Sequence, residues 1–136
     1  MARSFKVVIV TPDHTAFEGE AVAATIPGQE GYLGVWANHA PLVAAVAPGV
    51  VTLRTDDAGS EQTLAVGAGF VEISNNVVNL MTDTCELAGE IDMARAQKAL
   101  ERARQRLAHV EEHLDRERAR LAQARAQARL KVARRN

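Results

Sequence analysis

The sequence has little of several residue types that stabilise or anchor particular classes of protein. Cys85 is the single cysteine among 136 residues, which excludes an intrachain disulfide and a cysteine-based zinc site. The longest unbroken apolar run covers 42–47, far short of the roughly 20 residues that a membrane-spanning helix requires. No signal-peptide or transit segment precedes the first strand-like residues, so we expect a soluble protein of a reducing compartment.

Glycine and proline are missing from the last third of the chain, since all nine glycines and all four prolines lie at or before Gly89. Charge divides at the same place: residues 1–89 carry a net charge of −7 and residues 90–136 a net charge of +6. Such asymmetry indicates two modules that face different partners.

The first module has the pattern of short strands separated by turn residues. Phe5 to Val10 is β-branched and ends at a proline, and further strand-like stretches cover 17–26, 50–55, 70–74 and 77–81. Asn75 and Asn76 tolerate positive φ, so the last two stretches are predicted to form a hairpin. Short strands at close spacing favour an antiparallel β-sandwich, or flattened barrel, over residues 1–86.

The second module, residues 87–136, is rich in strong helix formers. Leucines recur every seven residues from Leu100 to Leu121, which is typical of helices that pack side by side. A single helix would be roughly 70 Å long, too long to bury itself on a small sandwich, so we predict a two-helix hairpin with its turn near 108–115 or packing on another protein. Arg118, Arg125 and Arg129 follow the apolar seam and are either solvated or matched by an anionic surface.

Other motifs favour structural interpretations. His109 and His113 match an H-x-x-E-H zinc-peptidase pattern, but no further carboxylate lies at a suitable distance, so we predict neither a metal site nor catalytic residues. Gly67 and Gly69 precede a strand and are interpreted as a turn or bulge, and Cys85 as a packed residue. A basic coiled coil that binds nucleic acid, carried by a β-sandwich adaptor, remains the alternative, although the module lacks aromatic residues for base stacking.

Three stretches together resemble the epsilon subunit of bacterial F-type rotary ATP synthases. They are 27–42 (PGQEGYLGVWANHAPL), 66–84 (VGAGFVEISNNVVNLMTDT) and 91–96 (IDMARA). The resemblance covers nearly the whole chain, and its β-sandwich followed by two helices agrees with the division at Gly89. It implies a non-catalytic subunit on the cytoplasmic face of the bacterial plasma membrane, which reaches the membrane only through the complex and requires no cofactor.

The resemblance also implies partners. The sandwich would bind the gamma subunit and rest on the ring of c subunits of a proton-translocating synthase, without nucleic acid. The ring-facing residues would be Glu30, Gly31, Tyr32, Leu33 and His39. Tyr32 stands where some relatives carry an acid, and His39 is equally well interpreted as a residue that fixes the loop.

In the family the helical hairpin is a switch: folded against the sandwich it permits ATP hydrolysis, and extended along gamma it inhibits. The extended form would meet acidic surfaces of the catalytic beta and alpha subunits through a basic face, made of Arg116, Arg118, Arg120, Arg125 and Arg129. Some bacterial relatives bind ATP as a regulatory ligand on the folded hairpin, and the matching residues here are Glu86, Ile91, Asp92, Arg95, Ala96, Arg102, Arg125 and Arg129. From helical geometry alone, Asp92, Arg95 and Arg102 fall within an arc of about 80°.

Overall fold

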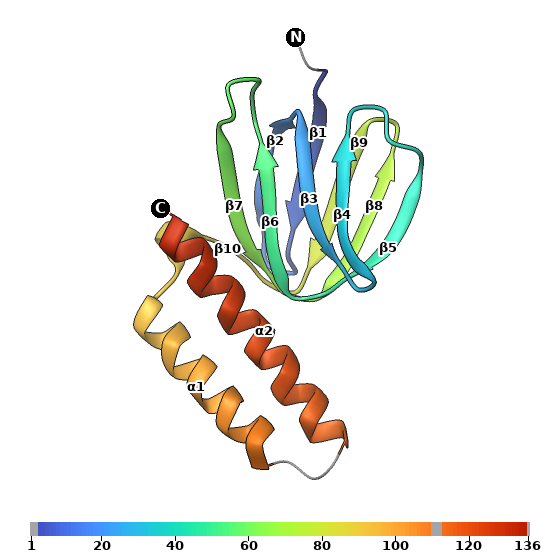
Figure 1. Ribbon diagram of the computed structural model, residues 1–136. Coiled ribbons are helices and arrows are strands. Elements are labelled where there is room, and N and C mark those ends of the chain that lie inside the picture. Colours follow the sequence, from blue (N-terminus) through green and yellow to red (C-terminus); the bar gives the residue numbers. More distant parts are fainter. Residues whose placement is uncertain (1–2, 110–112, 136) are drawn as a thin grey trace.

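A computed structural model describes residues 3–109 and 113–135, and consists of a β-sandwich followed by two antiparallel helices (Figure 1). The first helical segment is a short 3-10 turn, η1 (Ala88–Glu90), which links the sandwich to the helices. The strands are β1 (Phe5–Val10), β2 (Thr15–Ala21), β3 (Ala23–Gly28), β4 (Gly31–Trp36), β5 (Leu42–Val46), β6 (Gly49–Arg54), β7 (Glu61–Val66), β8 (Gly69–Ser74), β9 (Val77–Thr82) and β10 (Cys85–Leu87).

The strands form one continuous sheet that folds over on itself where β3 meets β5, at the pair Gly28 and Val46. One layer contains β10, β7, β6, β3 and β4, and the other contains β5, β8, β9, β1 and β2 (Figure 1). All described pairings are antiparallel except that of β1 with β9. The predicted sandwich is confirmed, with this one parallel pair as the feature that local sequence patterns do not reveal.

The core lies between the two layers, because alternate side chains of each strand point inward. In β1, Phe5, Val7 and Ile9 are at most 2% exposed, whereas the intervening residues face outward. Leu53 of β6 and Leu64 of β7 belong to the other layer, and both are completely buried in the same core. This two-residue period leaves the outer faces free to carry function.

The predicted hairpin at Asn75 and Asn76 is confirmed. Both asparagines have positive φ, 51° and 62°, as a two-residue turn between twisted strands requires. The Asn76 amide also donates to the carbonyl of Ser4 at 3.0 Å and accepts from the backbone N–H of Asn38 at 2.7 Å. The turn therefore ties together three segments that are distant in the sequence.

The C-terminal module is the predicted two-helix hairpin. Helix α1 (Met93–His109) begins at Asp92, whose carboxylate caps it by accepting from the N–H of Arg95 at 3.0 Å. Helix α2 (His113–Arg135) runs back along α1, and residues 110–112 of the predicted turn lie outside the described residues. One buried cluster of the hairpin is formed by Leu100 and Leu130 with small residues, Ala96, Ala99 and Ala126. No helix in the described ranges combines the length and apolar character needed to cross a bilayer.

Candidate functional site

The register of the sheet aligns three residues in one row on the outer face of the layer that contains β10. Val50 of β6 pairs with Ala65 of β7, and Ala65 pairs with Glu86 of β10. Two apolar residues are thus followed by one carboxylate at the edge of the sheet. This row is the surface on which the helical hairpin docks.

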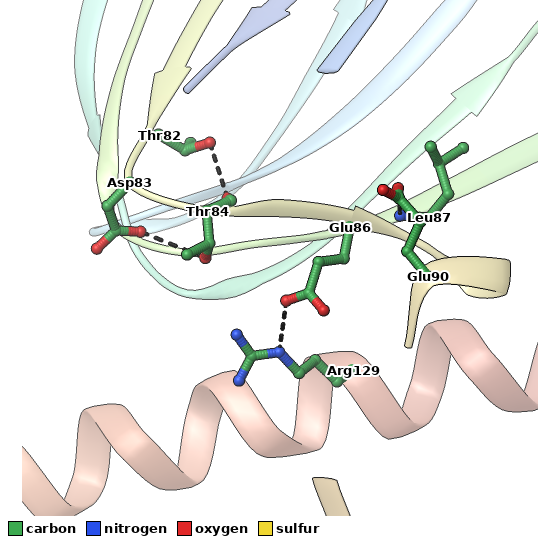
Figure 2. A network of polar contacts seen from close by, with 7 residues as sticks. All are labelled: Thr82, Asp83, Thr84, Glu86, Leu87, Glu90 and Arg129. Carbon is green, nitrogen blue, oxygen red and sulfur yellow. Dashed lines mark hydrogen bonds and ion pairs between the residues drawn. The ribbon is translucent and has the colours of Figure 1, made fainter. Parts of the chain in front are cut away.

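Helix α2 covers the row with a matching sequence of residues. Ala128 and Val132 pack on Val50 and Ala65, and Val132 is completely buried. Arg129 lies beside them, and its Nε donates to Glu86 Oε1 at 2.6 Å (Figure 2). The two side chains of this ion pair are only 29% and 27% exposed, so solvent screens it less than a surface pair.

A hollow of about 400 Å³ opens next to this ion pair, between the sandwich edge and the two helices. Its lining includes six of the residues that the sequence predicts for a nucleotide site: Glu86, Asp92, Arg95, Ala96, Arg102 and Arg129. Asp92, Arg95 and Arg102, which helical geometry predicts within one arc, all line this one hollow.

Two of the predicted residues lie elsewhere. Ile91 packs against the apolar cluster of Val50 and Val132 under α2. Arg125 is half-buried on α2 and does not line the hollow, so the four-arginine set reduces to three. Arg125 precedes Arg129 by about one helical turn, which places it farther from Glu86 along the helix axis.

Glu90 and Ala99 also line the hollow, and sequence reasoning missed them. Glu90 ends η1, where its carboxylate accepts from the backbone N–H of Leu87 at 3.0 Å (Figure 2). Ala99 follows Arg95 by four residues, a spacing that returns to the same face of a helix and that could have indicated it.

The hollow carries three guanidinium groups that could meet a phosphorylated ligand and three carboxylates, those of Glu86, Glu90 and Asp92. Three guanidinium groups can donate pairs of hydrogen bonds to phosphate oxygens, whereas the carboxylate of Asp92 is already engaged as the cap of α1. An anion that enters the hollow would share the Arg129 guanidinium with Glu86. Within residues 3–109 and 113–135, no cluster of three potential metal ligands exists.

The predicted basic face of α2 is divided in this conformation. Arg116 and Arg118 are exposed near the start of α2, and Arg129 is engaged by Glu86. Arg120 bonds Glu117 at 2.6 Å one turn away, and this hydrogen bond, followed by the charge of the carboxylate, raises the pKa of Arg120 above its ordinary value. Two arginines of the basic face, Arg120 and Arg129, are thus paired with carboxylates of this chain in the folded conformation.

The predicted ring-facing residues lie at the two ends of strand β4. Glu30 lies in the β3–β4 turn and Gly31 begins β4, whereas His39 follows the other end of β4. Tyr32 is 59% exposed, and its hydroxyl lies 3.5 Å from the N–H of Val50. Leu33 is half-buried and points into the sandwich.

His39 has a defined contact in its loop. Its ring Nδ1 lies 2.6 Å from the carbonyl oxygen of Ala40, to which a protonated Nδ1 donates. This contact supports the interpretation of His39 as a residue that fixes the loop between β4 and β5.

The remaining sequence motifs have structural explanations. A Cβ on Gly69 would lie 1.9 Å from the carbonyl oxygen of Met81, so only glycine fits at the start of β8, and the turn interpretation is confirmed. Burial, followed by the charges of Glu90 and Glu86, raises the pKa of the Cys85 thiol to about 12, as expected for a packed cysteine. The H-x-x-E-H motif falls partly outside the described residues.

Family models cover both modules. The β-sandwich domain of the ATP synthase delta/epsilon chain matches residues 4–88, and the long α-helix domain of the same chain matches residues 90–134. The chain belongs to the delta/epsilon-chain family of the F-type ATP synthases. It is a stalk subunit of that complex. The family matches therefore favour an ATP synthase subunit over the nucleic-acid-binding adaptor that the sequence left as an alternative.

Relatives match along nearly the whole chain. An ATP synthase epsilon chain of Shouchella clausii is 41% identical over 130 residues, covering 96% of this chain and 95% of the relative. That of Moorella thermoacetica is 42% identical over 130 residues, covering 96% of each. Both modules are therefore present in these relatives.

Solved structures agree with the fold. A chain in the Euglena gracilis mitochondrial ATP synthase structure with OSCP, F1 and c-ring superposes with a TM-score of 0.76 and 26% identity, covering 93% of this chain and 79% of that one. A chain in the Tetrahymena thermophila central stalk and c-ring structure shares the fold, with a TM-score of 0.60 and 13% identity over 94% and 95% of the two chains.

Proposed function

We propose that this chain couples rotation in a proton-translocating F-type ATP synthase and inhibits ATP hydrolysis through a folded/extended switch of its helical hairpin, without catalytic residues of its own. The observation that carries the proposal is the small contact that holds the hairpin down. Among the described residues it consists of the cluster of Val50, Ala65, Ala128 and Val132, with Ala88 and Ile91 packed against it, and one ion pair between Glu86 and Arg129. A contact of this size can be exchanged for another surface at low cost.

The sandwich supplies the permanent attachment in this proposal, to the gamma subunit and the c-ring. Its outer strand β4 pairs only with β3 in the described part of the chain, and Tyr32 and Trp36 on it are 59% and 60% exposed. Exposed aromatic side chains are typical of protein interfaces. Glu30 and His39 at the two ends of β4 would then border one contact along the strand, at the cytoplasmic face of the membrane.

The basic face of α2 supplies the inhibitory contact. When the hairpin extends, Arg129 leaves Glu86 and joins Arg116, Arg118, Arg120 and Arg125 against acidic surfaces of the catalytic beta and alpha subunits. The exchange of one carboxylate partner for others keeps Arg129 paired in both conformers, so this arginine is never buried without a partner.

ATP is the regulatory ligand that fits the hollow beside Glu86 and Arg129. Arg95 and Arg102 on α1 and Arg129 on α2 would hold its phosphates, so the ligand contacts both helices and the sandwich edge. Because the hollow exists only while the hairpin is folded, ATP would favour that conformer by its differential affinity.

A crosslink tests the switch. Cysteines introduced at Ala65 and Ala128, two members of the docking cluster, in a Cys85→Ser background would hold the folded form when oxidised. In the assembled synthase we expect oxidation to relieve the inhibition of ATP hydrolysis and reduction to restore it, with the Cys85→Ser chain as the control. Equal hydrolysis rates in the oxidised and reduced states would refute the switch.

Calorimetric titration with ATP tests the ligand. We expect saturable heat from the whole chain and a loss of about tenfold or more in affinity for Arg102→Gln, because one charge-assisted phosphate contact is removed. Arg106→Gln, an exposed arginine of α1 outside the hollow, is the matched control. The absence of heat up to millimolar ATP would overturn the ATP site and leave the crosslink result unaffected.

A further inference from the structure

A second groove lies between the two helices, separate from the hollow described above. It has a volume of about 600 Å³ and is lined by residues of α1 and α2 alone. Its cations are Arg104 from α1 and Lys131, Arg134 and Arg135 from α2. No acidic side chain is among the described residues that line it.

Helical geometry places the groove on the opposite side of the hairpin from the hollow that contains Arg102. Arg104 follows Arg102 by two residues, a rotation of about 200° around α1. The groove floor is apolar, since it includes Leu100 and Leu130, which are 5% and 3% exposed and meet in the helix interface. The cations of both helices therefore border one shared leucine floor.

The four cations are not neutralised by the described part of the chain. None of them takes part in an ion pair or side-chain hydrogen bond among residues 3–109 and 113–135. Arg134 and Arg135 stabilise the C-terminus of α2, where the helix dipole favours positive charge. That role does not apply to Arg104, which lies within α1. Positive charges from two helices are thus brought to one groove, and no described acidic side chain pairs with them.

We propose that this groove binds an oxyanion of the phosphate class and that binding favours the folded hairpin. Planar guanidinium groups match phosphate oxygens in pairs, and Gln97 and Gln127 add neutral donors at the groove. The lining contains no aromatic side chain to stack on a base, so the phosphate is the recognised group. Its source is free phosphate or pyrophosphate, or the phosphate tail of a nucleotide.

The ligand would bind to the closed hairpin alone. Arg104 and Lys131 belong to different helices, so only the folded form places both at one anion. An anion bound between them therefore stabilises the folded form and opposes the separation of α1 from α2. This effect is independent of the hollow beside Glu86, and it holds whether or not ATP binds there.

Calorimetric titration of the whole chain with orthophosphate, pyrophosphate and ATP, at about 0.1 M salt to screen weak surface attraction, tests the site. We expect saturable binding of pyrophosphate by the native chain and by Arg102→Gln, and a loss of about tenfold or more in Arg104→Gln and in Lys131→Gln. Glutamine is a strong helix former at these exposed positions, and circular dichroism checks that the variants fold.

The outcomes separate this site from the ATP proposal. Weaker pyrophosphate binding in Arg104→Gln but not in Arg102→Gln supports the groove, whichever way the ATP titration goes. Binding of ATP alone, loss only in Arg102→Gln, or no saturation by pyrophosphate at about 10 mM would overturn it, since charge-assisted contacts from two helices should exceed that affinity.

Discussion

Replacing Val132 by alanine should loosen the hairpin from the sandwich without unfolding either module. Val132 is completely buried between α2 and the row of Val50 and Ala65. The change removes about two methylene equivalents, worth about 0.8 kcal/mol each, and leaves a cavity that the neighbouring side chains close in part. The net cost of about 1–2 kcal/mol raises the undocked population by about five- to thirtyfold.

Limited trypsin digestion measures that population selectively. Thirteen of the sixteen lysines and arginines lie after residue 89, so the hairpin carries most cleavage sites. When docking is fast relative to cleavage, the cleavage rate follows the open population. Cutting after Arg129 and Lys131, identified by mass spectrometry, should accelerate by this factor in Val132→Ala.

The matched control is Val43→Ala, which makes the same change at a 70% exposed position on β5, in the other layer. Its cleavage pattern should equal that of the native chain. If Val132→Ala also leaves the rate of cutting at Lys131 unchanged, the apolar cluster does not hold the hairpin down and the reasoning fails.

Two further residues of the sandwich, Asn76 and Cys85, give testable predictions. Asn76→Ala should lower the free energy of unfolding by about 2 kcal/mol, because it loses the hydrogen bonds to Ser4 and Asn38 and places alanine at a φ of 62°, which is strained for that residue. Asn76→Gly should recover part of this loss, because glycine adopts positive φ without strain. Equal urea midpoints for the two variants would contradict the strain argument. Cys85, with its pKa raised to about 12, should have about a thousandfold less thiolate at pH 8 than an ordinary cysteine, so iodoacetamide labelling should require opening. Because the pKa of this thiol is higher in the folded chain than in the unfolded chain, stabilisation by the neutral thiol is complete below pH 9 and declines toward pH 12. Urea unfolding of the native chain and of Cys85→Ala from pH 7 to 10 measures this effect. The difference between their free energies of unfolding should shrink as the pH rises.

Much of the fold could be predicted because local signals agree with the final structure. The loss of glycine and proline after Gly89 marks the change from strands to helices, and the Asn75–Asn76 pair specifies its hairpin directly. The arc formed by Asp92, Arg95 and Arg102 needed only the helical period, and the structure places all three at one hollow.

The rest depended on strand register, which sequence patterns do not encode over long separations. Glu86 meets Arg129 only because Ala65 pairs with Glu86 on one side and with Val50 on the other. Helical periodicity assigned Arg125 and Arg129 to the same stripe and could not tell which of them reaches the sheet edge. That choice is made by where α2 crosses the sandwich.

The helix interface explains why anions could control the hairpin. Alanines let α1 and α2 approach closely but bury little apolar area, so Leu100 and Leu130 supply most of the apolar contact in their cluster. Cations of both helices gather at the second groove, Arg104 from α1 and Lys131 from α2, and they repel one another while the hairpin is closed. A weak apolar seam beside this cationic groove closes more tightly when an anion neutralises the groove, and this makes the folded state responsive to anions rather than fixed by its core.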